Sequence, residues 1–143
     1  MAKKILSIFT FIYSLIITVS LNAEIIKKIE IDGNVRISDE TIKVYGDLKE
    51  LNSDYSKSDL DNILKNLYST NFFENVSLEI KNNTLFILLD EYPVINQLLI
   101  VGEKSNKFKN EINKIISTKE KGSFIENNLN KDINRIKNLY STL

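Results

Sequence analysis

Residues 65–70 read Lys-Asn-Leu-Tyr-Ser-Thr, and the same six residues return at 137–142. A weaker echo precedes each copy, because residues 29–33 (Ile-Glu-Ile-Asp-Gly) match residues 98–102 (Leu-Leu-Ile-Val-Gly) in type. Both matches are separated by about 70 residues, which is the signature of a repeated structural unit. The sequence therefore predicts two related units in tandem, and its last residue follows directly after the second hexapeptide.

The first 23 residues have the pattern of a secretory signal peptide. Lys3 and Lys4 form a short basic start, residues 5–21 are uncharged and apolar, and Ala23 offers a small residue for cleavage. Because the apolar run approaches the length of about 17–25 residues that spans a bilayer, an uncleaved membrane anchor is the alternative. No cysteine follows the run, which excludes a lipid-anchored lipoprotein. We expect residues 1–23 to be removed and the chain to be exported.

The composition argues against several classes of protein. The 19 basic and 19 acidic residues give a formal net charge of zero, so a basic surface for nucleic acid is not expected. The chain has no histidine and no cysteine, which removes the usual nucleophile pairs and zinc ligands. Asp59 and Asp61 are explained as acids at a helix start, and Asp90-Glu91 as a solvated strand end. We expect no enzyme activity, no metal and no cofactor.

Residues 24–92 are expected to form one β-α-α-β-β unit. Residues 25–31 alternate apolar and polar side chains, which predicts a strand with Ile29 and Ile31 on its buried face. Gly33 then supplies turn chemistry, because glycine adopts positive φ without strain.

Two helices follow this strand. Ser38 is expected to cap the first helix and Gly46 to end it, while Ser58 and Asp61 fit a capping box for the second. Asn71 suits the left-handed position just after the second helix. The side chains expected to face inward are Ile42 and Tyr45 on the first helix, and Leu60, Ile63, Leu64 and Leu67 on the second.

A hairpin closes the unit. Asn82-Asn83 fits a two-residue type I′ loop, in which both residues need positive φ. Residues 85–89 are apolar on both faces, which predicts a central strand, whereas residues 76–80 are half polar and suit an edge. Counting outward from the loop places six apolar side chains on one face, in the pairs Ile80–Leu85, Leu78–Ile87 and Val76–Leu89.

Pro93 marks the expected start of a second, partial unit at residues 93–143. We expect its first strand at residues 94–101 and its closing hairpin beyond Leu143. Tyr68 and Tyr140, at matching repeat positions, are expected to be structural residues in the core at helix ends. The expected helical stripes are Phe108, Ile112, Ile115 and Ile116, and then Leu129, Ile133, Ile136 and Tyr140.

Four stretches of the chain resemble the POTRA domains of BamA-type outer-membrane protein assembly factors. They are residues 29–34 (Ile-Glu-Ile-Asp-Gly-Asn), 36–42 (Arg-Ile-Ser-Asp-Glu-Thr-Ile), 67–76 (Leu-Tyr-Ser-Thr-Asn-Phe-Phe-Glu-Asn-Val) and 91–96 (Glu-Tyr-Pro-Val-Ile-Asn). The resemblance covers residues 24–143 and implies an α+β fold: tandem POTRA-like β-α-α-β-β units, each with a three-stranded mixed sheet and two helices on one face, the second unit incomplete.

The resemblance implies a periplasmic binding module beside the bacterial outer membrane. The partners it implies are unfolded outer-membrane proteins, a periplasmic chaperone and accessory outer-membrane lipoproteins, with membrane contact only through a C-terminal barrel outside this sequence. Two alternatives share a POTRA unit: membrane-anchored division proteins similar to FtsQ, and transporters of two-partner secretion systems. The start of a second unit disfavours the first alternative, and the lack of a proline-rich segment after Ala23 disfavours the second.

The expected binding site is the free edge of the sheet, where an extended client could pair through its backbone. Its residues are Asn75, Val76, Ser77, Leu78, Glu79, Ile80 and Lys81. The competing interpretation is an ordinary edge strand that Glu79 and Lys81 protect from aggregation. Phe86 and Leu88, on the face that the helices leave bare, are a second candidate contact; alternatively they pack against a neighbouring segment or unit.

Overall fold

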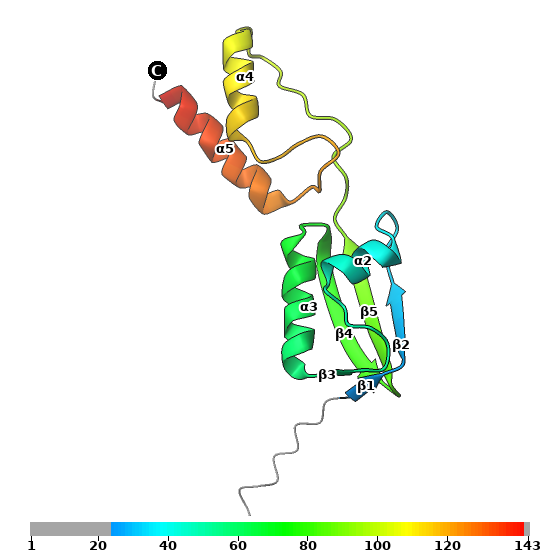
Figure 1. The fold of residues 1–143 in the computed structure, drawn as a ribbon. Coiled ribbons are helices and arrows are strands. Elements are labelled where there is room, and N and C mark those ends of the chain that lie inside the picture. Colours follow the sequence, from blue (N-terminus) through cyan, green and yellow to red (C-terminus); the bar gives the residue numbers. More distant parts are fainter. Residues whose placement is uncertain (1–23, 142–143) are drawn as a thin grey trace, which may run out of the picture.

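The computed structural model describes residues 24–141, so the predicted signal peptide lies outside the described residues. Nine elements follow one another in the described residues, and the first seven form a three-stranded sheet, a small two-stranded sheet and two helices (Figure 1). In order they are β1 (Glu24–Ile26), β2 (Lys28–Asp32), α2 (Asp39–Tyr45), β3 (Ser53–Tyr55), α3 (Lys57–Ser69), β4 (Phe73–Lys81), β5 (Thr84–Glu91), α4 (Asn106–Ile115) and α5 (Glu126–Ser141).

The main sheet has three strands in the order β2-β5-β4. β5 pairs in parallel with β2 and antiparallel with β4, so the sheet is mixed, β5 is central and β4 lies at an edge, as predicted. Helices α2 and α3 cover one face, where Ile42 and Leu67 pack into the same buried cluster as Ile87. The expected α+β fold with two helices on one face of a mixed sheet is confirmed.

The β4–β5 hairpin has the predicted turn and register. Asn82 and Asn83 have φ of 52° and 61°, the left-handed values that a type I′ loop requires. The Cα partners are Val76 with Leu89, Leu78 with Ile87 and Ile80 with Leu85. The residues of β5 in these pairs are fully buried, so turn geometry and hydrophobic burial select the same register.

The helix ends are partly as predicted. Ser38 caps α2 and Gly46 ends it, and Asn71 takes φ of 57° just after α3. The predicted cap at Ser58 is wrong, because α3 begins two residues earlier with Ser56 as its cap. The Ser56 hydroxyl accepts from the Asp59 amide while the Asp59 carboxylate accepts from the Ser56 amide, a reciprocal pair that Asp61 cannot replace.

The first predicted strand divides into two at Lys27. The amides of Lys27 and Lys28 both donate to the Asn83 carbonyl, and the chain changes partner there. β1 pairs with β3, which the sequence did not indicate, and β2 pairs with β5. Ile26 is therefore the fully buried residue of this segment, whereas Ile29 and Ile31 are only half-buried.

Tyr45 does not face inward as predicted. Its side chain is half exposed and lies edge-on to the Phe72 ring, with ring centroids 5.9 Å apart. Tyr45 is the last residue of α2, so it lies at the margin of the contact between the helix and the sheet. The ring therefore covers Phe72 at the rim of the core.

The C-terminal part consists of α4 and α5, which pack against each other with Ile112 and Ile116 buried (Figure 1). The strand predicted at residues 94–101 is wrong: within residues 24–141 this segment forms only a single bridge, between Val94 and Ser123. Residues 93–95 exchange backbone hydrogen bonds with residues 121–124, but no described strand continues the pairing, and a strand needs such a neighbour along its length. The division into tandem units at Pro93 remains a prediction.

Replacing Ile87 by Ala is expected to lower the free energy of unfolding by about 2–5 kcal/mol, because it leaves a cavity beneath both helices. Ile87 is 1% exposed, whereas its neighbour Leu88 is 53% exposed on the opposite face. The matched Leu88→Ala change is therefore expected to cost less than about 1 kcal/mol. Urea unfolding followed by circular dichroism compares them, and equal losses would contradict the assignment of faces.

Candidate functional site: the open edge of β4 and the helix-free face

The alternation of the β4–β5 ladder decides which backbone groups of β4 are free. In an antiparallel pair, facing residues alternate between exchanging two hydrogen bonds and exchanging none, and in the latter the backbone groups point away from the partner. The Val76 amide donates to the Tyr68 hydroxyl at 3.1 Å, so it points away from β5. By the same alternation the amide and carbonyl groups of Leu78 and Ile80 also point outward.

The far end of the hairpin agrees with this assignment. The Tyr92 amide donates to the Phe72 carbonyl, which makes Phe73 and Glu91 a pair without mutual hydrogen bonds. An irregularity between Phe73 and Asn75 inserts one extra residue, after which the alternation again leaves Val76 pointing outward. Among the described residues, no hydrogen bond from outside the sheet reaches the outward groups of Leu78 or Ile80. We call these groups the open edge of β4.

Tyr68 is not the core residue that the sequence predicted. Its side chain is 43% exposed, and its hydroxyl lies at the outer side of β4. The hydroxyl accepts from the Val76 amide and lies 3.4 Å from both the Val76 carbonyl and the Asn75 side-chain oxygen. Tyr68 thus satisfies the outward position at Val76, and the open edge begins at Leu78.

The second candidate lies on the helix-free face, around Phe86 and Leu88. Phe86 is 36% exposed and Leu88 53% exposed, so no described segment covers them. Both line a shallow hollow of about 720 Å³ on this face of the sheet. Phe86 lies between Glu30 on β2 and Glu79 on β4, which makes an apolar centre with an acidic border.

These two candidate sites adjoin along β4. Ser77 and Glu79 are the nearest β4 neighbours of Leu88 and Phe86, and their own backbone groups bond to β5. An extended segment added to the open edge would therefore place every second side chain beside Glu79, next to the apolar centre. Of the predicted residues, Ser77, Glu79, Phe86 and Leu88 share the helix-free face, whereas the side chains of Val76, Leu78 and Ile80 lie on the core side of the sheet.

The interpretation of Asp90-Glu91 as a solvated strand end is wrong for Glu91. Its side chain is only 7% exposed, and its carboxylate accepts from the amides of Val35, Arg36 and Ile37 and from the Arg36 side chain. Burial raises the pKa of Glu91, but the hydrogen bonds from three amides and the guanidinium outweigh it, so the pKa lies below its usual value. Glu91 fastens the loop before α2 to the end of β5.

Gly33 shows why this loop has to start with glycine. Its φ is +85°, and a Cβ at this position would lie 1.9 Å from the Leu89 carbonyl oxygen. The close approach brings the loop against β5, where the Glu91 carboxylate accepts hydrogen bonds from the loop amides. Sequence reasoning found Gly33 as a turn residue but missed the link between this loop and Glu91, because it joins residues more than 50 positions apart.

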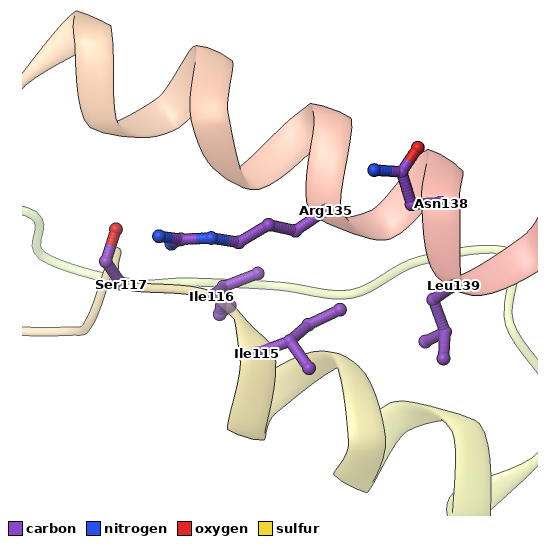
Figure 2. A pocket seen from close by; sticks show the side chains of 6 residues that line it. All are labelled: Ile115, Ile116, Ser117, Arg135, Asn138 and Leu139. Atoms are coloured by element: carbon purple, nitrogen blue, oxygen red, sulfur yellow. The ribbon is translucent and has the colours of Figure 1, made fainter.

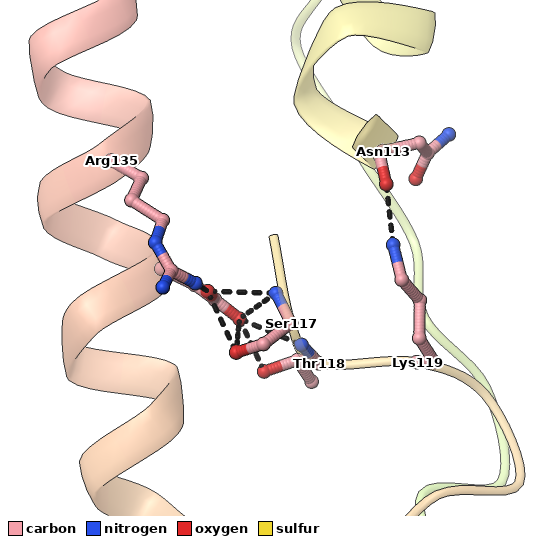
Figure 3. Close-up of polar contacts among 6 residues, drawn as sticks. Asn113, Ser117, Thr118, Lys119 and Arg135 are labelled. Atoms are coloured by element: carbon pink, nitrogen blue, oxygen red, sulfur yellow. Dashed lines mark hydrogen bonds and ion pairs between the residues drawn. The ribbon is translucent and has the colours of Figure 1, made fainter. Parts of the chain in front are cut away.

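A second buried carboxylate, Asp132, holds the C-terminal helices together. It is 2% exposed and accepts from the amides and hydroxyls of Ser117 and Thr118, and from Arg135 (Figure 3). Burial raises the pKa of Asp132, but the hydrogen bonds from Ser117 and Thr118 lower it by more. The pKa therefore lies far below its usual value. The cluster joins the end of α4 to α5 and is fully satisfied internally, so it is an anchor.

The hollows of the C-terminal part are predominantly apolar. One of about 660 Å³ lies between α4 and α5, where Ile115, Ile116 and Leu139 gather beside Arg135 (Figure 2). Another of about 600 Å³ lies between the helices and residues 98–103. Within residues 24–141, no group of three or more acidic, histidine or cysteine side chains is placed to hold a metal ion. In the same range, every helix is too short or too polar to cross a membrane.

Comparison with known proteins places these features in a family context. No protein-family model matches the chain. The chain is 25% identical over 118 residues to the "Outer membrane protein assembly factor BamA" of Neorickettsia risticii (strain Illinois), a match that covers 82% of this chain and 16% of that protein. The chain thus spans 16% of the length of this relative.

Two solved structures share the fold. The N-terminal domain of Omp85 from Thermosynechococcus elongatus matches 85% of this chain and 52% of its own, with a TM-score of 0.57 and 14% identity. POTRA1-3 of the periplasmic domain of Omp85 from Anabaena matches 86% of this chain and 52% of its own, with a TM-score of 0.51 and 13% identity. The chain therefore has the fold of Omp85 POTRA domains, and the resemblance that the sequence indicated is confirmed.

Replacing Glu91 by Gln is expected to lower the free energy of unfolding by about 1–3 kcal/mol, because it removes the charge that three amides and Arg36 solvate. The folded-state pKa is depressed, so this stability is present above the unfolded pKa of about 4.3 and is lost as the pH falls through the folded pKa. The difference between the two proteins should therefore be largest above about pH 5 and shrink below about pH 4.

The neighbouring Asp90→Asn change is the matched control. Asp90 is exposed on the opposite face, and among the described residues its side chain accepts a hydrogen bond from the Asn75 amide alone, at 3.4 Å. It is expected to change stability by no more than about 0.5 kcal/mol. Urea unfolding at several pH values provides the comparison, and a pH-independent effect of Glu91→Gln would count against the depressed pKa.

Proposed function

We propose that this chain is a POTRA binding module that takes up extended segments of unfolded polypeptide as an additional strand on β4. The observation that carries the proposal is the open edge, where the amide and carbonyl groups of Leu78 and Ile80 point outward without a partner in the described chain. Pairing through the backbone gives affinity with little demand on side-chain sequence, which suits a module that receives many clients.

The proposed setting is the assembly of outer-membrane proteins. The relative from Neorickettsia risticii is named as an outer membrane protein assembly factor, and the similar solved structures are the N-terminal domain of one Omp85 protein and POTRA1-3 of another. In this setting the clients are unfolded outer-membrane proteins, and a periplasmic chaperone and accessory lipoproteins dock on the same module. The proposed location is the periplasmic side of the outer membrane, and the role is binding without catalysis or a cofactor.

Phe86 and Leu88 contribute a second contact in this proposal. An added strand would present alternate side chains on the helix-free face, where Glu79 and then Phe86 are its nearest neighbours. A large apolar side chain of the client could cover part of the exposed Phe86 ring, which burial would stabilise. The face would then reward clients with apolar residues at alternate positions and add selectivity to the backbone pairing.

The edge charges fit a reversible binding site. Glu79 lies between Leu78 and Ile80 and Lys81 follows them, and such charges discourage two identical edges from pairing. The protective interpretation and the binding interpretation are therefore compatible. Short edges with charged borders keep free modules apart, while an extended client can still pair with Leu78 and Ile80.

A crosslinking experiment with a matched control tests the proposal. Glu79 and Glu30 lie directly opposite Phe86, on its two sides, and only Glu79 belongs to the proposed edge strand. We expect a photo-reactive residue at position 79 to capture an unfolded outer-membrane protein at least about tenfold more efficiently than one at position 30, because the added strand lies beside β4.

The outcome separates two modes of binding. Equal capture at positions 79 and 30 would mean that clients dock across the helix-free face, and strand addition would be wrong. Capture at position 30 alone would move the site to β2, the other edge of the sheet. No capture at either position, with capture by probes on α4 or α5, would exclude the whole surface.

A further inference from the structure

We infer that the Tyr68 hydroxyl fixes the register of the added strand by closing the Val76 position of the β4 edge. This inference rests on the proposed function, because it specifies where along β4 a client pairs. With Val76 occupied, the outward groups left between Val76 and the hairpin turn are those of Leu78 and Ile80. Tyr68 is thus a positioning residue that decides where an added strand starts.

The geometry at Val76 accounts for both of its backbone groups. The Tyr68 oxygen lies 3.1 Å from the Val76 nitrogen and 3.4 Å from the Val76 carbonyl oxygen. A phenolic hydroxyl can accept one hydrogen bond while donating another, so a single side chain occupies the place of a neighbouring strand's backbone. The Asn75 side-chain oxygen, also at 3.4 Å, is an alternative acceptor for the same proton.

The end of α3 holds Tyr68 in this place. Tyr68 is the second-last residue of α3, and the helix packs along β4. The Thr70 hydroxyl donates to the Leu67 carbonyl at 2.6 Å and accepts from the Phe72 amide at 3.1 Å, which fixes the turn into β4. The turn at Asn71, with its left-handed φ, completes the connection. The closing group is therefore positioned by local hydrogen bonds that no client needs to disturb.

The second copy of the hexapeptide supplies a natural comparison. Tyr140 stands at the position of Tyr68 in this repeat, but its hydroxyl bonds to Glu103 and its ring stacks on Phe108 with centroids 5.9 Å apart. Tyr140 is 43% exposed, as is Tyr68. The same local sequence thus places a tyrosine hydroxyl at a strand edge in one copy and at a carboxylate in the other.

The register determines the chemistry of the client. Client side chains opposite Leu78 and Ile80 lie on the helix-covered side, where Leu78 and Ile80 are themselves partly buried against the core. Side chains between them lie on the helix-free side, beside Glu79 and Ser77. The register therefore favours an extended segment that pairs with residues 77–81 and carries apolar side chains on the helix-covered side.

Amide exchange with a model client tests the inference. The probe is a short soluble peptide that alternates valine with serine and lysine, and exchange is read at each residue by NMR on the full chain. In the wild type and in Tyr140→Phe, the peptide should slow exchange at Leu78 and Ile80 and leave Val76 unchanged. In Tyr68→Phe, the free chain should exchange Val76 at least about tenfold faster, since it loses the hydrogen bond that protects it.

The same variant should bind the peptide more tightly. Tyr68→Phe frees both backbone groups of Val76, so the peptide should protect Val76 as well and bind about threefold to tenfold more tightly, as one or two added hydrogen bonds allow. Tyr140→Phe should bind like the wild type. A measurement without mutation supports the comparison: in the free wild type, Val76 should exchange more slowly than Leu78 and Ile80.

The outcomes distinguish this inference from the function on which it rests. Protection at Leu78 and Ile80 with no change at Val76 and no gain in affinity in Tyr68→Phe would overturn the role of Tyr68 and leave strand addition intact. A peptide that protects no residue of β4 in any variant would overturn strand addition and with it the client register. Fast exchange of Val76 in the free wild type would overturn the inference by itself.

Discussion

The register of the β4–β5 hairpin is the constraint on which the rest of the structure depends. Asn82 and Asn83 close a two-residue turn, and the ladder that follows alternates in both side-chain direction and backbone direction. A slip of one residue would move the apolar side chains of β4 from the core to the helix-free face. The same slip would turn the outward groups of Leu78 and Ile80 inward, so one constraint sets both the core and the open edge.

Two buried carboxylates hold loops that lie outside the β4–β5 ladder. Glu91 gathers the amides of the loop before α2, and Asp132 gathers those of the turn after α4. In each case one side chain satisfies several backbone donors of a loop at once. The chain contains no cysteine, so these polar links and the apolar core hold its loops in place without disulfides.

Local signals made much of the fold predictable, and distant partners made the rest unpredictable. The Asn82-Asn83 turn, the central strand and the Ser38 cap depend on residues within one or two turns of the chain. The pairing of β1 with β3, the anchor at Glu91 and the position of Tyr68 depend on partners that no local pattern identifies. The strand expected at residues 94–101 fails for the same reason, since periodicity cannot supply the neighbour that a strand needs. The edge residues of the candidate site followed from the hairpin alone, but which backbone groups are free required Tyr68.

The central claim is that Leu78 and Ile80 present their backbone groups away from β5, and interproton distances test it most directly. Facing residues without mutual hydrogen bonds have Cα atoms about 4.5 Å apart, against about 5.5 Å for bonded pairs, so their α-protons are close. Nuclear Overhauser spectra should show strong contacts between the α-protons of Leu78 and Ile87. Strong contacts between the α-protons of Ser77 and Leu88 instead would contradict the open edge.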